Sequence, residues 1–107
     1  MANTKQEQKA DRFQQLHRQE GMFVIPNSWD AGSAYIYEKE GFPCVATSSA
    51  GVASALGYPD GEDITLDDLI DCVTKTVRRV DVPVSCDFER GYAEDPEQVK
   101  KNARRII

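Results

Sequence analysis

Three short apolar runs divide the chain, and each is followed by a group of polar residues. The first run, residues 22–25, is continuous and lacks the alternation that marks a half-exposed strand. A short continuous apolar run is typical of a strand buried on both faces, as in a parallel sheet. The pattern predicts strands over residues 22–26, 44–47 and 82–87.

Helical patterns precede and separate these runs. In the clearest one, Leu, Ile and Val side chains recur at intervals of three and four positions. Thr65 is placed to cap this helix, and Asp67 and Asp68 lie in its first turn, where carboxylates favour the helix dipole. The predicted helices cover residues 5–20, 30–40, 65–80 and 96–107.

The order of these elements predicts the fold class. A leading helix followed by three strand–helix units is typical of an α/β architecture with a parallel sheet and right-handed crossovers. Three strands cannot close a barrel, which takes about eight at normal tilt. The chain ends on Ile106 and Ile107 inside an apolar helical pattern without a cap. We therefore expect residues 1–107 to be a single partial domain, truncated in its last helix.

Composition excludes several classes of partner. Hydrophobic residues make up 40% of the chain and charged residues 29%, which is the profile of a soluble globular protein. The formal net charge of −5 provides no basic footprint for nucleic acid. No apolar run approaches the length of about 20 residues needed to span a membrane. The polar opening residues lack the core of an export signal, so we expect a cytoplasmic protein.

The metal-binding and redox chemistry of cysteine is not expected. Cys44, Cys72 and Cys86 show no close pair and no metal-type spacing, so they are interpreted as reduced thiols. The single histidine, His17, lies in a polar helical stretch, which argues against a zinc site.

Polar clusters follow all three predicted strands, at residues 27–30, 48–60 and 87–92. In a parallel α/β fold, binding groups gather at the carboxyl ends of the strands. Residues 48–63 are predicted to form a long loop, and a loop of this length in a compact domain is usually functional or mobile. The sequence therefore predicts a binding site at this end of the sheet.

Asp87 and Glu89 are the candidate metal ligands. In extended backbone, two side chains two positions apart point to the same side. Two convergent carboxylates suit Mg²⁺, a hard ion that keeps several of its waters. The alternative interpretation is a hydrated acidic loop, or a carboxylate that caps the following helix.

The candidate substrate contacts lie in the other two clusters. Ser48, Ser49 and Ala50 offer hydroxyls and backbone amides that can approach an anion, although an ordinary flexible loop is the alternative. Asp60 suits a ligand or a general base, but an Asp in such a turn often caps its own backbone. Trp29 is placed to line a pocket or simply to pack.

Three motifs in order resemble the isocitrate lyase/phosphoenolpyruvate mutase superfamily. The likeness runs from about Phe13 onward, and each motif lies at a strand end. The first motif is VIPNSWDAGSA (24–34). The second is GFP (41–43) with ATSSAGVA (46–53) and LGYPDG (56–61). The third is VPVSCDFERGY (82–92).

This resemblance implies the first three units of a (β/α)8 TIM-type barrel and an Mg²⁺ cofactor, with Mn²⁺ as an alternative. Asp87 would be a metal ligand directly or through water, and Glu89 would stand where the family often has Asp. Ser48, Ser49 and Ala50 would hold the substrate's carboxylate and oxo oxygens, although many members have two glycines at the last two positions.

The resemblance further implies a catalytic Asp60 close to the substrate and the metal's water shell. Full-length members form homodimers or homotetramers by exchanging their last helix. The family's later acidic residue, gating loop and arginine clamp come from strands beyond the third. The reactive cysteine of the lyases belongs to that gating loop, so the three cysteines here do not inherit its role.

The implied activity is that of a lyase or phosphonomutase-type isomerase. Such an enzyme makes or breaks a C–C or P–C bond of a small 2-oxo or hydroxy acid through an enolate-like intermediate. Its substrate is a small carboxylate or phosphonate, and lyases, mutases and hydrolases share this part of the barrel. Two alternatives are a non-catalytic fragment or half-barrel that assembles with another chain, and a plain α/β binding domain.

Overall fold

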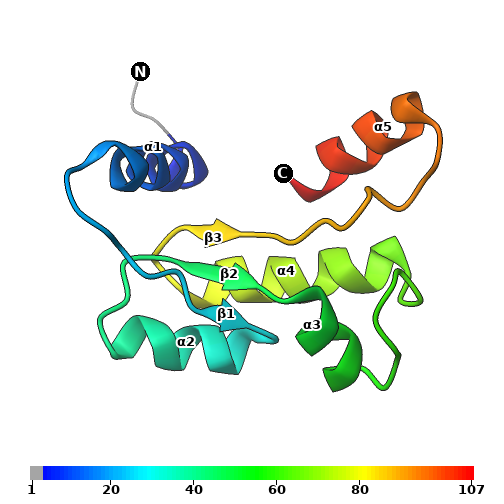
Figure 1. Cartoon of the computed structure of the whole chain (residues 1–107), viewed down its shortest axis with the longest axis horizontal. Coiled ribbons are helices and arrows are strands. Elements are labelled where there is room, and N and C mark those ends of the chain that lie inside the picture. The colour runs from blue at the N-terminus through cyan, green and yellow to red at the C-terminus, as the bar shows by residue number, and fades with distance from the viewer. Residues whose placement is uncertain (1–3) are drawn as a thin grey trace.

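The computed structural model describes residues 4–107 and has an α/β architecture (Figure 1). Residues 1–3, which belong to the polar opening in which no export signal was expected, lie outside the described residues. In chain order the elements are α1 (Lys5–Arg18), β1 (Asn27–Ser28), α2 (Ala31–Lys39), β2 (Val45–Thr47), α3 (Ser49–Ala55), α4 (Leu66–Arg79), β3 (Val84–Ser85) and α5 (Pro96–Ile106).

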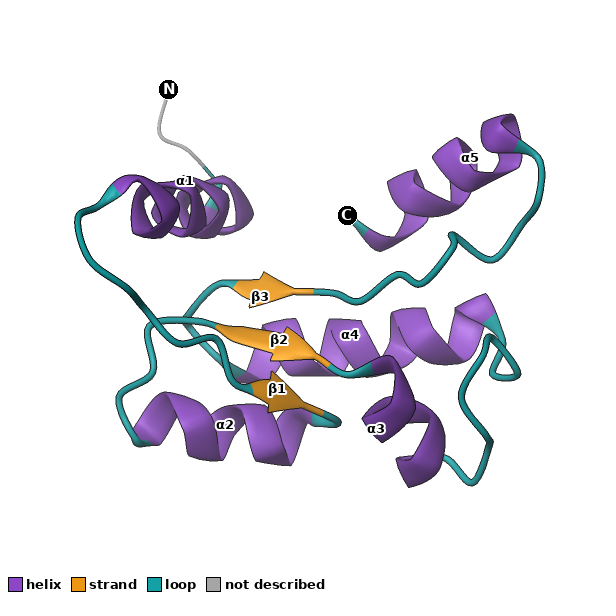
Figure 2. Cartoon of the chain, in the orientation of Figure 1, coloured by secondary structure: helices purple, strands orange, loops and turns teal. Residues whose placement is uncertain are grey.

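The three strands form a parallel sheet in the order β1-β2-β3. Asn27 pairs with Ala46, and Val45 pairs with Val84. Helices α2 and α4 pack against each other, and α2 also lies against β1 and β2. In Figure 2, α1 and α5 lie on the β3 side of the sheet, away from α2, and α3 lies at the end toward which the strand arrows point.

The first strand lies later than the sequence indicated. A strand buried on both faces was expected over 22–26, but Met22 is 91% exposed and Val24 56% exposed, and pairing begins at the Pro26 carbonyl, which accepts a hydrogen bond from Ala46 N. The physical reason is that β1 is an edge strand of this sheet. The apolar run before Pro26 has no strand opposite it on either side, so it stays unpaired.

The loop expected over 48–63 contains helix α3. Ser48 caps this helix, since its hydroxyl oxygen accepts a hydrogen bond from Gly51 N at 3.1 Å. Serine favours the cap position and alanine the interior, so the small-residue content that suggested a loop also permits a helix. The third strand is also shorter than the expected 82–87. Its pairing with β2 begins at the Pro83 carbonyl, which accepts a hydrogen bond from Val45 N, and beyond Ser85 the Asp87 amide bonds to the Thr47 side chain and not to a backbone carbonyl. The other elements begin and end within two residues of expectation.

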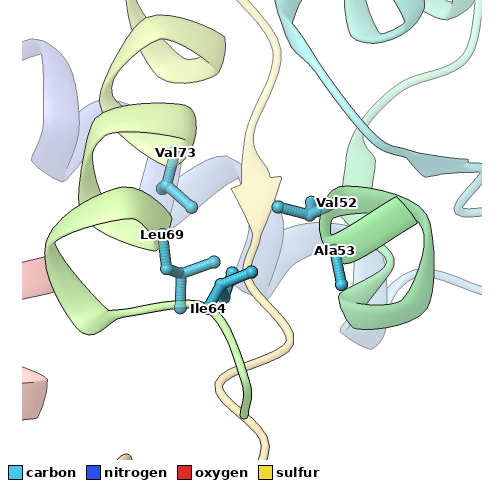
Figure 3. Close-up of a cluster of buried hydrophobic side chains, with 5 residues drawn as sticks. All are labelled: Val52, Ala53, Ile64, Leu69 and Val73. Atoms are coloured by element: carbon cyan, nitrogen blue, oxygen red, sulfur yellow. The ribbon is translucent and has the colours of Figure 1, made fainter. Parts of the chain in front are cut away.

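Two apolar clusters hold the helices to the sheet. In the first, Val52 and Ala53 of α3 pack with Leu69 and Val73 of α4 and with Ile64 between them (Figure 3). Burying a Val, Leu or Ile side chain stabilises the fold by about 1.5–3 kcal/mol. This cluster therefore fixes the segment that joins α3 to α4. The second cluster comprises Ala34, Val45 and Val80.

The opposite end of the sheet is held by polar contacts. The Lys9 ammonium donates hydrogen bonds to the Val77 and Val80 carbonyls at 3.1 and 2.7 Å, and so caps α4. A Glu38 oxygen accepts hydrogen bonds from the amides of Asp81 and Val82. The Lys9 contacts dock α1 away from the strand carboxyl ends, and the Glu38 contacts hold α2 to the turn after α4. Within residues 4–107, no helix has the length and apolar character that crossing a membrane requires.

Candidate functional site

The carboxyl ends of the three strands are joined by short hydrogen bonds. Ser48 N donates to the Ser28 carbonyl at 2.9 Å, which joins the ends of β1 and β2. Asp87 N donates to the Thr47 hydroxyl oxygen at 3.0 Å, which joins the segments after β2 and β3. Consequently, the polar groups that follow the strands lie at one edge of the sheet, as the parallel topology predicts.

Ser48 and Trp29 meet at the start of α3. A side chain at Gly51 would lie 3.0 Å from Trp29 Cβ and 3.3 Å from the Ser48 side chain, so glycine permits this close packing. Trp29 is nevertheless 44% exposed, and its ring is therefore available at the surface. The hydroxyl of Ser48 already accepts the Gly51 amide, while Ser49 and Ala50 form the first turn of the helix.

Asp87 and Glu89 do not share the extended geometry expected from their spacing. The strand ends at Ser85, and Glu89 has a left-handed backbone with φ of 50°. Asp87 Oδ1 accepts a hydrogen bond from Glu89 N at 3.0 Å, so this carboxylate also holds its own turn. The reason for the difference is this tight turn, which replaces a continued strand and redirects the Glu89 side chain.

The turn brings Glu89 to the carboxylates of the preceding loop. Partial desolvation raises the pKa of Glu89, the hydrogen bond from the Tyr92 hydroxyl at 3.2 Å lowers it, and the nearby carboxylates of Asp60 and Glu62 raise it. Burial, followed by the charge of Glu89, raises the pKa of the Tyr92 hydroxyl, which therefore stays a proton donor. Asp60 and Glu89, two of the predicted site residues, are thus neighbours.

Two residues outside the predicted set support this loop. The Glu62 carboxylate accepts hydrogen bonds from the backbone amides of Arg90 and Tyr92 at 2.9 and 3.3 Å. Asn102 of α5 is buried and donates to the Gly91 carbonyl at 2.9 Å. A polar residue at an otherwise apolar position of a helix was the available signal for Asn102. For Glu62, one acid among several in a turn, the sequence carries no distinguishing signal.

The donor chemistry of this edge fits a hard divalent ion. The clustered groups are carboxylates, whose mutual repulsion a cation would relieve. Within the described part of the chain, no three His, Cys, Asp or Glu side chains come close enough to hold a metal ion between them. An ion that keeps most of its water shell, as Mg²⁺ does, suits such a site better than zinc does.

Comparison with known proteins identifies the family. Residues 13–107 match the phosphoenolpyruvate phosphomutase family model. An uncharacterised protein of Mycobacterium tuberculosis (strain CDC 1551 / Oshkosh) is 39% identical over 87 residues, which are 81% of this chain and 33% of that protein. The 2-methylisocitrate lyase of Halalkalibacterium halodurans is 32% identical over 87 residues, which are 81% of this chain and 29% of that enzyme. The chain thus spans about a third of the length of the curated relatives it matches.

Solved structures show the same fold. A protein of Burkholderia cenocepacia J2315, provisionally described as a lyase or mutase, superposes with a TM-score of 0.91 at 38% identity, covering 96% of this chain and 37% of that one. The phosphoenolpyruvate phosphomutase of Streptomyces platensis subsp. rosaceus superposes with a TM-score of 0.85 at 25% identity, covering 91% and 33%. The three-stranded sheet corresponds to the N-terminal part of these TIM-type barrels. The chain therefore belongs to the phosphoenolpyruvate phosphomutase family, within the isocitrate lyase/PEP mutase superfamily.

Proposed function

We propose that this chain supplies the first three strands of an Mg²⁺-dependent lyase or mutase that acts on a small 2-oxo or hydroxy acid. The observation that supports the proposal most strongly is the meeting of Asp60 with Glu89, one turn beyond Asp87, at the carboxyl ends of the strands. A group of acidic side chains at this edge is suited to a cation and to the proton transfers of acid chemistry.

In this proposal, Asp87 and Glu89 hold Mg²⁺, largely through its waters, with Mn²⁺ as a substitute. When bound, the ion supplies Lewis-acid stabilisation of the negative charge that develops on substrate oxygens. Asp60 is assigned to proton transfer because its carboxylate faces Glu89 from a separate loop. The negative charges of Asp60 and Glu62 lie close to Glu89, and a bound cation would offset their repulsion.

We assign substrate binding to the segment after β2. The amides of Ser49 and Ala50 lie in the first turn of α3, where backbone N–H groups lack helical partners and can bind a carboxylate or oxo oxygen. Trp29 Cβ lies close to Gly51 in this helix and the residue is 44% exposed, so we assign its ring to the apolar part of a small acid. Three of the similar proteins are named for small acids: 2-methylisocitrate lyase, phosphoenolpyruvate phosphomutase and oxaloacetate acetylhydrolase.

A groove supports the proposal that further strands complete the barrel. It lies between α1, α4 and α5, and apolar side chains from the helices and from the segment around β3 line it: Phe13, Val73, Val77, Val84, Cys86, Phe88, Ala103 and Ile106. In a closed barrel the helices form the outer ring, so further β/α units would pack beside these helices and beside β3. We expect the complete enzyme to be a homodimer or homotetramer, as the family resemblance implies.

The test of the proposed function is an activity screen of the full-length protein that contains this sequence. Purified protein is incubated with a panel of 2-oxo acids, 2-hydroxy acids and phosphonates, in Mg²⁺ and in EDTA. We expect turnover of at least one substrate that EDTA abolishes and Mg²⁺ restores. Absence of turnover across the panel, or turnover that EDTA does not reduce, would contradict the proposal.

The groove also supports a second candidate, in which the 107-residue chain is a half-barrel that assembles with another chain. The intact mass of the native protein separates the two candidates. A mass about three times that of this chain, as the relatives' lengths suggest, supports the enzyme. A native 107-residue product that elutes as a complex supports the half-barrel.

A further inference from the structure

We propose that Glu62 is a positioning residue of the site: its carboxylate fastens the Asp87–Tyr92 loop to the loop that carries Asp60, and so sets the spacing of the proposed metal-binding acids. This inference rests on the proposed function, in which Asp87 and Glu89 hold Mg²⁺. Glu62 itself is not placed against the ion or the substrate.

The contacts of Glu62 are unlike those of an ordinary surface acid. Its side chain is only 9% exposed. One oxygen, Oε2, accepts the backbone amides of Arg90 and Tyr92 at 2.9 and 3.3 Å, and the other, Oε1, accepts Arg90 Nε at 3.2 Å. One carboxylate thus binds three donors from a loop 28 to 30 positions later in the chain.

The loop that Glu62 holds has an unfavourable backbone. Glu89, Gly91 and Tyr92 have φ of 50°, 88° and 59°, in the left-handed region that costs free energy for residues with a side chain. Such conformations persist only where surrounding contacts fix them. The two amide bonds to Glu62 are contacts of this kind, and they lie on both sides of Gly91.

Glu62 also fixes the loop to which it belongs. It has φ of 67° and follows Gly61, with φ of 109°, in the turn that begins at Asp60. Because Asp60 lies two positions before Glu62, anchoring Glu62 to the Asp87–Tyr92 loop carries Asp60 toward Glu89. The paired Arg90 guanidinium offsets the additional negative charge that Glu62 brings.

The contact of Glu62 with the Arg90 side chain can be tested apart from its bonds to the two backbone amides. Glu62→Gln can keep an oxygen toward the two backbone amides and loses only the acceptor for Arg90 Nε. Glu62→Ala loses all three bonds. Asp63→Ala is the matched control, since Asp63 is an adjacent, exposed acid with the same charge. Should Glu62→Ala fail to fold, Glu62→Asp replaces it, because it keeps the charge but withdraws the oxygens by one methylene.

The experiment measures the Kd for Mg²⁺ by calorimetry, kcat on the substrate found in the screen, and hydrogen exchange of the Arg90 and Tyr92 amides, all in the full-length protein. For Glu62→Ala, or for Glu62→Asp in its place, we expect at least about a tenfold weaker Mg²⁺ affinity, a similar fall in kcat and faster exchange of both amides. Glu62→Gln should recover most of each loss, and Asp63→Ala should match the wild type.

Four outcomes would overturn the inference. A folded Glu62→Ala protein with Mg²⁺ affinity and kcat within twofold of the wild type would exclude a positioning role. Equal losses in Glu62→Gln and Glu62→Ala would exclude the role of the two amide bonds, as would unchanged exchange of both amides. Wild-type protein that binds no Mg²⁺ would instead refute the proposed function and, with it, the positioning role.

Discussion

The hydroxyl oxygen of Thr47 accepts a hydrogen bond from the backbone amide of Asp87 at 3.0 Å. Thr47 is the last residue of β2 and is only 4% exposed, and Asp87 lies two residues beyond the end of β3. This bond continues the alignment of the two strands past the point where their backbone pairing ends. It therefore fixes where the segment with the proposed metal ligands leaves the sheet.

Replacing Thr47 with Val should weaken both the fold and the site. Valine has the same shape but no acceptor, so the Asp87 amide loses its partner, at a cost of about 1–3 kcal/mol in unfolding free energy. We expect kcat/KM of the full-length enzyme to fall as well. Thr47→Ser, which keeps the oxygen, is the control for denaturant unfolding and activity. Equal stability of the Val and Ser variants would show that the hydrogen bond contributes nothing.

Gly91→Ala should destabilise the same loop. Gly91 has φ of 88°, and an added Cβ would lie 2.5 Å from Val99 Cγ1 on α5. Backbone strain and this clash together should lower the free energy of unfolding by about 2–4 kcal/mol.

Gly57→Ala is the matched control for Gly91→Ala, because Gly57 has φ of 87° but no atom within 4 Å of the added Cβ. Its free energy of unfolding should fall by only about 1 kcal/mol, because the substitution adds backbone strain but no clash. Thermal melts of the two variants measure the difference. Equal shifts in Tm would argue against the Val99 contact.

The cysteines should react slowly and should not serve in catalysis. Burial raises the pKa of Cys44, Cys72 and Cys86 above the ordinary value of 9.0. Unfolded thiols lose their protons at lower pH than the folded ones, so the unfolded state binds fewer protons in that range. The free energy of unfolding should therefore fall as pH rises from about 9.

Labelling with a disulfide reagent measures the reactivity of the three thiols directly. We expect slow modification of the native protein at pH 7.5, with a marked increase above pH 9 and in denaturant. Cys86→Ser is a useful control, because Cys86 packs against the apolar cluster beside Phe88. Fast labelling of the native protein at pH 7.5 would show that a thiolate is present and would contradict the assigned environments.

The parallel α/β sheet and the family could be predicted from the sequence. The apolar runs and the spacing of Leu66 to Val80 reflect burial, and burial is what a hydrophobic pattern records. The bounds of the strands were harder to predict from the sequence. The run before Pro26 is apolar without being paired, and the Ser- and Gly-rich segment 48–63 holds α3, since capping by Ser48 depends on one side-chain hydrogen bond.

The geometry of the candidate site was harder to predict. The spacing of Asp87 and Glu89 suggested an extended pair, whereas Glu89 adopts a left-handed backbone and faces Asp60. That arrangement depends on Glu62, which contacts the loop from about 30 positions away in the chain. Local patterns carry no record of such a tertiary contact.

We propose that Asp87 serves the metal site and does not merely hold its own turn. Asp87 Oδ1 accepts the Glu89 amide, so a structural role and a functional one both predict that this residue matters. Asp87→Asn separates them, because asparagine can still accept the Glu89 amide but carries no charge for Mg²⁺. Asp87→Ala removes both the acceptor and the charge. Glu89→Ala should lower kcat less than Asp87→Ala does, because Glu89 lies farther from the sheet.

The most direct test is therefore kcat and Tm of Asp87→Asn in the full-length enzyme at saturating Mg²⁺. We predict a fall in kcat of about two to four orders of magnitude with an essentially unchanged Tm, as expected when a transition-state electrostatic contact is lost from a solvated strand end. Near-normal kcat in Asp87→Asn, together with a lowered Tm in Asp87→Ala, would show that Asp87 only holds the turn and would contradict the metal site.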